Sequence, residues 1–230
     1  MNDVSFQSLN SLGKQQMLTI NEIFYSIQGE STYAGWPCVF IRLTGCNLRC
    51  RYCDTTYAYY QGEDMLLDSI LSKVEDFSCN LVEVTGGEPL LQDETPSLIA
   101  ALIKNEHNVL LETNGSQDIS TVDNKCIRIV DIKCPSSGME QATYWKNLEH
   151  LTPRDQLKFV IANREDYLFA KTVLSNPLIK RNKELVINLS PVFNELDLKE
   201  LATWILEDKL RVRLHIQLHK YIWGENAKGV

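Results

Sequence analysis

The sequence predicts an α/β fold in which helices cover a mainly parallel sheet, either open or closed into a barrel. Strand patterns alternate with helical patterns through about six units, as in parallel α/β proteins. Several predicted strands are almost continuous apolar runs, which is typical of parallel strands covered by helices. The 230 residues, 44% hydrophobic and 23% charged, have the composition of one globular domain.

The individual elements follow from local patterns. Residues 1–18 are polar and are expected to form an N-terminal extension, loose or in a short helix, ahead of one domain over residues 19–230. Runs rich in β-formers between turn residues predict strands over residues 17–28, 38–46, 81–87, 108–115, 126–133, 156–162, 184–192 and 211–223. Amphipathic spacing predicts helices over residues 66–77, 95–105, 140–150, 164–176 and 195–208.

Polar residues and glycines gather where the predicted strands end. Because the carboxyl ends of parallel strands meet at one edge of a sheet, these segments are expected to form one site. The segments are Thr44–Cys46, Thr85–Glu88, Thr113–Gly115, Asp131–Lys133 and Ser190.

Charge and hydropathy exclude several partners. The net charge is -7 and no long basic run is present, which disfavours nucleic acid as a partner. No apolar stretch approaches the roughly 20 residues that span a bilayer, and the first residues lack the apolar core of a signal peptide. A cytoplasmic, reducing location is therefore expected. There, seven cysteines with three clustered favour metal binding over disulfides.

The clustered cysteines are Cys46, Cys50 and Cys53, whose spacing lets one loop wrap a metal centre. A zinc site completed by a distant cysteine or histidine is one interpretation, but no second pair with zinc-site spacing is present. A four-iron cluster with three cysteine ligands fits better, because it leaves one iron open for a small molecule. Of the other cysteines, Cys134 stays open as a ligand, and three are expected to be small buried hydrophobes: Cys38, Cys79 and Cys126.

The cysteine spacing, with Tyr52 before the third cysteine, resembles the signature of radical S-adenosylmethionine enzymes. The segment Thr85–Pro89 is similar to the GGEP element of that family, although Gly86 and Gly87 alone could form a structural turn. The resemblance implies a [4Fe-4S] cluster whose open iron binds S-adenosylmethionine and generates a 5′-deoxyadenosyl radical. It also implies cofactor contacts from Tyr52, Asp54, Gly86, Gly87, Glu88, Asp131, Lys133 and Ser190, although "DIKCPSSG" departs from part of the family.

Four further segments resemble the 7-carboxy-7-deazaguanine synthase family: "YSIQGES", "FIRLTGCNLRC", "CDTTYA" and "LHKYIW". The resemblance implies a truncated, open partial barrel of the (β/α)6 type and a homodimer. It also implies radical ring contraction of 6-carboxy-5,6,7,8-tetrahydropterin with loss of ammonia, within queuosine or 7-deazapurine biosynthesis. Magnesium and an electron donor such as flavodoxin or ferredoxin belong to the same expectation.

The resemblance further implies substrate contacts from Ile27, Gln28, Gly29, Glu30, Arg42, Thr85 and His219. Amides and carboxylates suit the donor–acceptor edge of a pterin, and a guanidinium suits its carboxylate. Each residue also has a simpler interpretation: turn chemistry around Gly29, a solvated Arg42, or a structural histidine at His219.

Thr55 matches the family position that binds Mg²⁺, whereas spacing alone would make Thr55 or Asp54 a helix cap.

The chain continues for eleven residues after His219, whereas some family members end near that position and place their terminal carboxylate on the substrate. A direct contact of that kind is therefore in doubt here. Two other functions remain open. One is an activase that installs a glycyl radical on a protein partner, and the other is a non-catalytic iron–sulfur or zinc module.

Overall fold

A computed structural model describes residues 16–225 and 227–230. One sheet runs through the protein in the order β3-β1-β2-β4-β5-β6-β7-β8-β9 and is not closed. β1 pairs antiparallel with β2 and β3, and the remaining neighbours are parallel. The strands are β1 Met17–Ile27, β2 Pro37–Leu43, β3 Glu63–Leu66, β4 Leu81–Gly86, β5 Asn108–Thr113, β6 Ile127–Asp131, β7 Gln156–Ile161, β8 Val186–Pro191 and β9 Arg213–Leu214.

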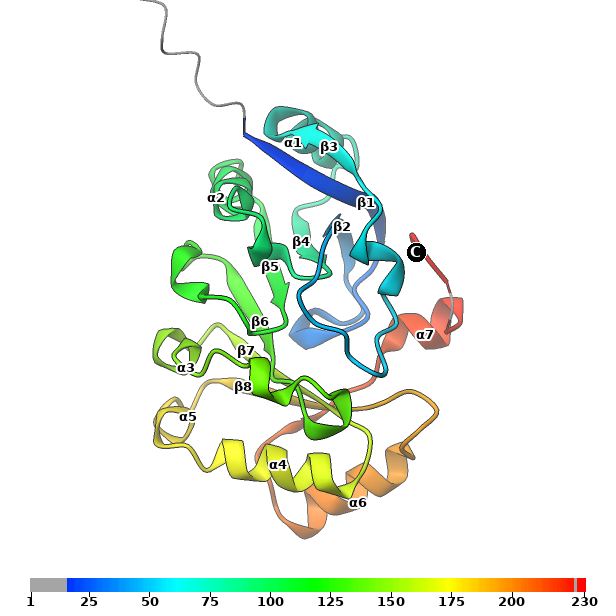
Figure 1. Cartoon of the computed structure of the whole chain (residues 1–230), viewed down its shortest axis with the longest axis vertical. Coiled ribbons are helices and arrows are strands. Elements are labelled where there is room, and N and C mark those ends of the chain that lie inside the picture. Colours follow the sequence, from blue (N-terminus) through cyan, green and yellow to red (C-terminus); the bar gives the residue numbers. More distant parts are fainter. Residues whose placement is uncertain (1–15, 226) are drawn as a thin grey trace, which may run out of the picture.

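Helices of very different length connect these strands. Figure 1 shows α2, α4 and α6 along the outer side of the curved sheet, and α7 beside β1 and β2. The α-helices are α1 Leu67–Glu75, α2 Thr95–Lys104, α3 Asn147–His150, α4 Arg164–Leu174, α5 Pro177–Arg181, α6 Leu198–Glu207 and α7 Leu218–Trp223. Among the described residues, no helix is long and apolar enough to cross a membrane.

The expected open, mainly parallel α/β partial barrel is confirmed, and most predicted elements lie within a few residues of their observed bounds. β1 begins at Met17, inside the predicted extension, whose residues 1–15 lie outside the described part of the chain. The patterns did not predict β3 or α5. The helix predicted over residues 140–150 is wrong, because that segment holds a short 3-10 helix, Glu140–Ala142, and the four-residue α3.

The strand predicted over residues 211–223 is also wrong. β9 pairs with β8 over only two residues, and the chain then forms α7. β8 ends at Pro191, two residues after the Leu189 that pairs with Leu214, so the chain from Gln217 onward has no strand beside it. A helix instead satisfies the backbone groups of this segment internally. The Leu218 backbone N–H also donates to the Gly29 carbonyl oxygen at 2.9 Å, which attaches α7 to the loop after β1.

Alternation along the strands separates an outer apolar face from an inner, mixed face. Val39, Ile41 and Leu43 of β2 are fully buried in the core cluster that includes residues of α1 and α2. Phe40, the intervening residue, joins a second cluster on the opposite face of the sheet. The same inner face therefore carries polar side chains farther along the strands, toward the site.

Candidate active site

One open cavity lies at the carboxyl ends of the parallel strands and encloses about 1550 Å³ including its mouth. Every predicted site residue lines it except Glu88 and Ser190. Ser190 is 1% exposed, and its hydroxyl has no hydrogen-bond partner within the described part of the chain. Four of the five predicted segments, those after β2, β4, β5 and β6, therefore meet in this cavity, and Ser190 does not line it.

The three clustered cysteines line this cavity and are partly exposed. Two donors reach the Cys46 sulfur: the Leu48 backbone N–H at 3.4 Å and the Asn114 side-chain amide at 3.8 Å. Such donors favour a thiolate at Cys46, and the shared position of the three cysteines in one cavity wall fits the iron–sulfur cluster that the motif implies. None of the other four cysteines lines the cavity; Cys38, Cys126 and Cys134 are fully buried, and Cys79 packs against the core.

The glycine pair of the GGEP element lets the end of β4 pack against the cysteine loop. A Cβ atom on Gly87 would lie 2.2 Å from the Gly45 carbonyl oxygen, and one on Gly86 would lie 2.3 Å from the Leu43 carbonyl oxygen. Glu88 then donates its backbone N–H to Gly45 at 2.7 Å. A side chain at either position would collide with the backbone of Leu43–Gly45, so both glycines are needed for the segment that leads into the cysteine loop to pack against them.

The Glu88 side chain is fully buried behind this loop and acts as an internal acceptor. It accepts hydrogen bonds from the Asn114 backbone N–H at 2.6 Å, the Leu90 backbone N–H at 3.0 Å and the Thr113 hydroxyl. Burial raises its pKa to about 7, although these donors act in the opposite direction. Glu88 therefore connects β4 with the end of β5 and stands outside the cavity wall.

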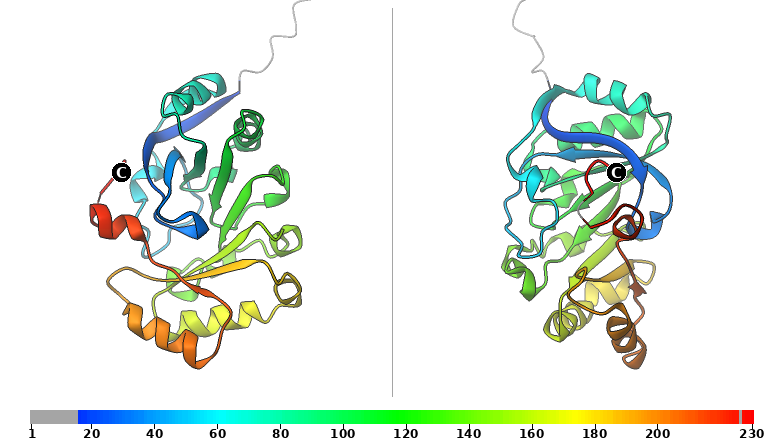
Figure 2. Two further views of the ribbon diagram at one scale, coloured as in Figure 1. Left: turned by 180° about the vertical axis from the view of Figure 1, so that it is seen from behind. Right: turned by 90° about the vertical axis from the view of Figure 1, so that its right-hand side faces the viewer.

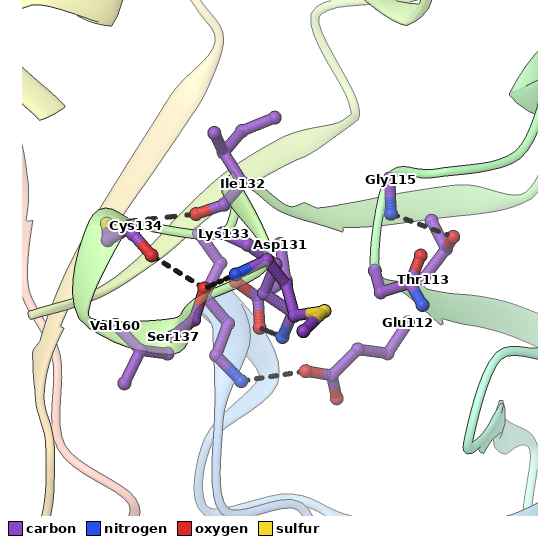
Figure 3. Close-up of polar contacts among 12 residues, drawn as sticks. Glu112, Thr113, Gly115, Asp131, Ile132, Lys133, Cys134, Ser137 and Val160 are labelled. Atoms are coloured by element: carbon purple, nitrogen blue, oxygen red, sulfur yellow. Dashed lines mark hydrogen bonds and ion pairs between the residues drawn. The ribbon is translucent and has the colours of Figure 1, made fainter. Parts of the chain in front are cut away.

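Asp131 and Lys133 form an ion pair at the end of β6, with Nζ 2.7 Å from one carboxylate oxygen (Figure 3). The second Asp131 oxygen is buried and has no hydrogen-bond partner among the described residues. An unpartnered acceptor in the wall needs a donor, and a ribose hydroxyl is one. Tyr52 also lines this side and donates its hydroxyl to the Val160 carbonyl oxygen at 3.3 Å.

A polar layer of carboxylates crosses the cavity and was only partly predicted. Glu30 was predicted, but Glu83 on β4, Glu112 on β5 and Lys158 on β7 were not. Each of these three is the one charged residue within an otherwise apolar stretch of strand, and the alternation places it on the inner face. That isolated charge was the signal available in the sequence.

Opposing effects set the ionisation of this layer. Burial would raise the pKa of Glu30, but attraction by Lys158 and two histidines outweighs burial and holds the pKa below its usual value. Burial raises the pKa of Glu83 well above its usual value, and neighbouring carboxylates raise it further. Glu30 is therefore held as an anion, whereas burial and the neighbouring carboxylates favour the protonated form of Glu83.

Gln28 holds the loop that carries Glu30. Its side-chain oxygen accepts the Glu30 backbone N–H at 2.9 Å, and its side-chain nitrogen contacts the Glu83 carboxyl. Because both ends of the amide have protein partners, the Gln28 side chain fixes the local conformation of this wall.

Arg42 is partly buried and lies beside Thr85 on the neighbouring strand. Its Nε donates to Glu22 at 2.7 Å, and its guanidinium lies 5.7 Å from the Phe24 ring centroid. The described residues offer no hydrogen-bond acceptor to its two terminal nitrogens. Arg42 is thus a pocket-lining cation with donors available for a carboxylate.

Asp54 and Thr55 lie between the cysteine loop and α7. The Asp54 carboxylate pairs with Lys220 at 2.7 Å and accepts the Thr55 hydroxyl at 3.0 Å. Partial desolvation in the cavity wall opposes ionisation of Asp54, whose side chain is 44% exposed, but Lys220 outweighs this effect and lowers its pKa. A 3-10 helix, Thr56–Tyr59, follows Thr55, which makes no side-chain capping bond to it.

The C-terminal segment turns back beside β1 and β2 (Figure 2). The Lys228 ammonium lies 4.4 Å from the centroid of the Tyr57 ring, and Glu225 accepts a hydrogen bond from Asn194 at 3.2 Å. The segment therefore forms part of the wall, through Glu225 and residues 227–230.

His219 packs directly on Gly29, so Gly29→Ala is expected to displace the histidine. The added Cβ would lie 2.1 Å from Nδ1 and 2.9 Å from the Cβ of His219, too near for any rotation of the ring to relieve. We expect the KM for substrate to rise roughly tenfold without loss of the cluster, because the cavity wall opposite the cysteine loop moves. Steady-state kinetics and cluster spectra measure both quantities.

The control for this prediction is the double variant Gly29→Ala/His219→Ala. Removing the ring frees the space, so the double variant should match His219→Ala alone. A KM of Gly29→Ala equal to that of the unsubstituted enzyme would contradict the steric explanation.

Comparisons with known proteins show the family of this chain. A family model described as the radical SAM superfamily matches residues 40–131. The 7-carboxy-7-deazaguanine synthase of Chlorobaculum tepidum is 47% identical over 216 residues, covering 93% of this chain and 97% of that protein. That of Koribacter versatilis is 42% identical over 227 residues, covering 93% and 100%.

A crystal structure of QueE from Escherichia coli is similar in fold, with a TM-score of 0.72 and 23% identity, over 88% of this chain and 95% of that one. The three cysteines and the GGEP element lie within the segment that the family model matches. The chain therefore belongs to the 7-carboxy-7-deazaguanine synthase family of radical S-adenosylmethionine enzymes.

Proposed function

We propose that this chain converts 6-carboxy-5,6,7,8-tetrahydropterin into 7-carboxy-7-deazaguanine with loss of ammonia. One observation carries the proposal: a single cavity holds both the three partly exposed cysteines and a layer of carboxylates and cations suited to a pterin. The relatives' names describe the same product. Cofactor and substrate would therefore be held side by side in one cavity.

The chain's own residues position the two molecules. Cys46, Cys50 and Cys53 would hold the cluster, which together with S-adenosylmethionine supplies the radical that removes hydrogen from the substrate. Asp131 offers an unpartnered acceptor for a cofactor hydroxyl, and Tyr52 offers an aromatic face for the adenine. These assignments rest on the family resemblance and on the position of each residue in the cavity wall.

The opposite wall would hold the substrate. The free terminal nitrogens of Arg42 suit the substrate carboxylate, and the carboxylate of Glu30 suits the N–H groups of the pterin edge. Ile27, Gly29, Thr85 and His219 complete this wall. Radical chemistry needs the reacting hydrogen to be presented in one orientation, and contacts at both ends of the pterin provide it.

We propose that Thr55 is a ligand of Mg²⁺, so Thr55→Ala should weaken the dependence on the metal. The absence of a capping bond at Thr55 and its place in the cavity wall favour this role over helix capping. We expect the magnesium concentration for half-maximal turnover to rise roughly tenfold, with the cluster intact. A magnesium titration of the reconstituted enzyme measures this.

The matched control is Thr56→Ala, which makes the same change at the adjacent, exposed residue. Thr56→Ala should keep the original magnesium dependence. If the two variants titrate alike, the ligand role of Thr55 is rejected.

The proposed function is tested on the full chain, reconstituted anaerobically with iron and sulfide. Electron paramagnetic resonance with and without S-adenosylmethionine comes first, and an unchanged signal would favour a non-catalytic iron–sulfur or zinc module. Incubation with 6-carboxy-5,6,7,8-tetrahydropterin, magnesium and reductant follows, and deazaguanine should appear. Cofactor cleavage without that product would favour the glycyl-radical activase. The homodimer, the flavodoxin or ferredoxin donor and the cytoplasmic location stay predictions.

A further inference from the structure

Lys158 is a buried ammonium held between two carboxylates that come from different parts of the chain. The side chain is 7% exposed, and its Nζ lies 2.7 Å from Oε1 of Glu112. It also forms an ion pair with Oε2 of Glu30, on the loop after β1. The ion pair of Glu112 is one of the dashed lines in Figure 3, where Glu112 lies near the segment that carries Asp131 and Lys133.

Both carboxylates keep capacity for a further partner. Glu112 binds Lys158 through Oε1, while its Oε2 has no hydrogen-bond donor within residues 16–225 and 227–230. Glu30 accepts the Gln217 amide on Oε1 at 2.9 Å and meets Lys158 through Oε2. Each carboxylate oxygen accepts two hydrogen bonds, so this pair can still receive N–H groups from a ligand.

The ammonium also keeps one donor. One of the three N–H groups of Lys158 donates to Glu112, and the ion pair with Glu30 takes up at most one more. Because Lys158 lines the cavity, its third N–H is available to a ligand there. The central part of the wall therefore presents acceptors on either side of one cationic donor.

This arrangement matches the C4 carbonyl oxygen of a tetrahydropterin, which lies between the N–H groups at N3 and N5. We propose that Lys158 is a specificity-determining residue that donates to this carbonyl oxygen, while Glu30 and Glu112 accept the neighbouring N–H groups. The inference rests on the proposed function and assigns a role within it. A pteridine with an amino group at C4 would present a donor to the Lys158 donor, so the site should reject it.

The role has a simpler competitor, which is neutralisation of buried negative charge. Lys158 lies near Glu30, Glu112 and Asp131, all of which favour its protonated form. A purely neutralising lysine would affect the binding of any pteridine equally. If Lys158 instead contacts the group at C4, replacing it changes the ratio of the dissociation constants of 4-amino and 4-oxo ligands. This ratio is the quantity to measure.

The experiment compares the dissociation constants of 6-carboxy-5,6,7,8-tetrahydropterin and its 2,4-diamino counterpart on the reconstituted enzyme with S-adenosylmethionine. The unsubstituted enzyme should bind the 4-oxo form roughly 30-fold more tightly or better. In the 4-amino form, the C4 amino group and the Lys158 ammonium are both donors, so neither has an acceptor. Lys158→Met should reduce this preference to less than about fivefold.

The matched control is Lys220→Met. Lys220 is also a buried, pocket-lining lysine paired with a carboxylate, Asp54, so the substitution removes the same charge from another part of the wall. It should keep the preference of the unsubstituted enzyme. If Lys158→Met does not fold, the charge-balanced double variant Lys158→Met/Glu112→Gln replaces it, with the same ratio as the readout.

The outcomes separate this inference from the proposed function. An unsubstituted enzyme that forms deazaguanine but binds the 4-oxo and 4-amino ligands equally would overturn the role of Lys158 alone. An unchanged preference in the folded Lys158 variant, or an equal loss in Lys220→Met, would do the same. Failure of the unsubstituted enzyme to turn over the 4-oxo compound would instead reject the proposed function.

Discussion

Cys50→Ala is expected to abolish product formation while leaving the fold almost unchanged. Cys50 lies on the loop between β2 and the following 3-10 helix and is only partly buried, so losing its sulfur removes little packing. With two thiolates left, the loop cannot hold a four-iron cluster that needs three. Iron and sulfide content, the cluster resonance and deazaguanine formation should all fall below detection, and the thermal midpoint of the cluster-free protein should shift by only a few degrees.

The control for this prediction is Cys134→Ala. Cys134 is fully buried and lies outside the cavity wall, and its thiol is 3.9 Å from the Ile132 carbonyl oxygen. This variant should keep the cluster and lose about 1 kcal/mol of stability from the small cavity it creates. A cluster retained in Cys50→Ala, or lost in Cys134→Ala, would remove the assignment of the three ligands.

Gly87→Ala has the second largest expected effect, because it separates the cysteine loop from β4. The added Cβ would lie 2.2 Å from the Gly45 carbonyl oxygen and 2.7 Å from the Cβ of Cys46. Both contacts are with the loop itself, so the backbone must move and carry a cluster ligand with it. We expect a loss of about 1–3 kcal/mol in stability and at least a roughly hundredfold fall in turnover.

Cluster occupancy distinguishes this effect from general destabilisation. Gly29→Ala is an equally crowded substitution, but it contacts His219 on the substrate side and should leave the cluster in place. Gly87→Ala should instead show reduced iron content and a broadened or absent cluster resonance. Equal cluster occupancy in the two variants would mean that Gly87 is not what positions Cys46.

The central strands and the site's position were predictable because local patterns report them directly. Apolar runs such as Leu157–Ile161 follow from burial on a covered sheet, and the strand-end rule placed the cysteine loop beside the glycine pair. The polar layer was partly visible as single charges in apolar strands. What each charge pairs with was not visible, because Lys158 meets Glu30 and Glu112 across large sequence separations.

The sequence by itself determined which groups are available for the site: three cysteine ligands in one loop, a glycine pair that backbone can approach closely, and the apolar strands that carry them. Only the tertiary structure decided where the chain after β9 goes. Its alternating polar and apolar residues would also fit an edge strand. In the structure it forms α7, which is hydrogen-bonded to Gly29, and then a segment that lines the cavity. That choice depends on where the neighbouring strand β8 ends in the assembled sheet, which no local pattern contains.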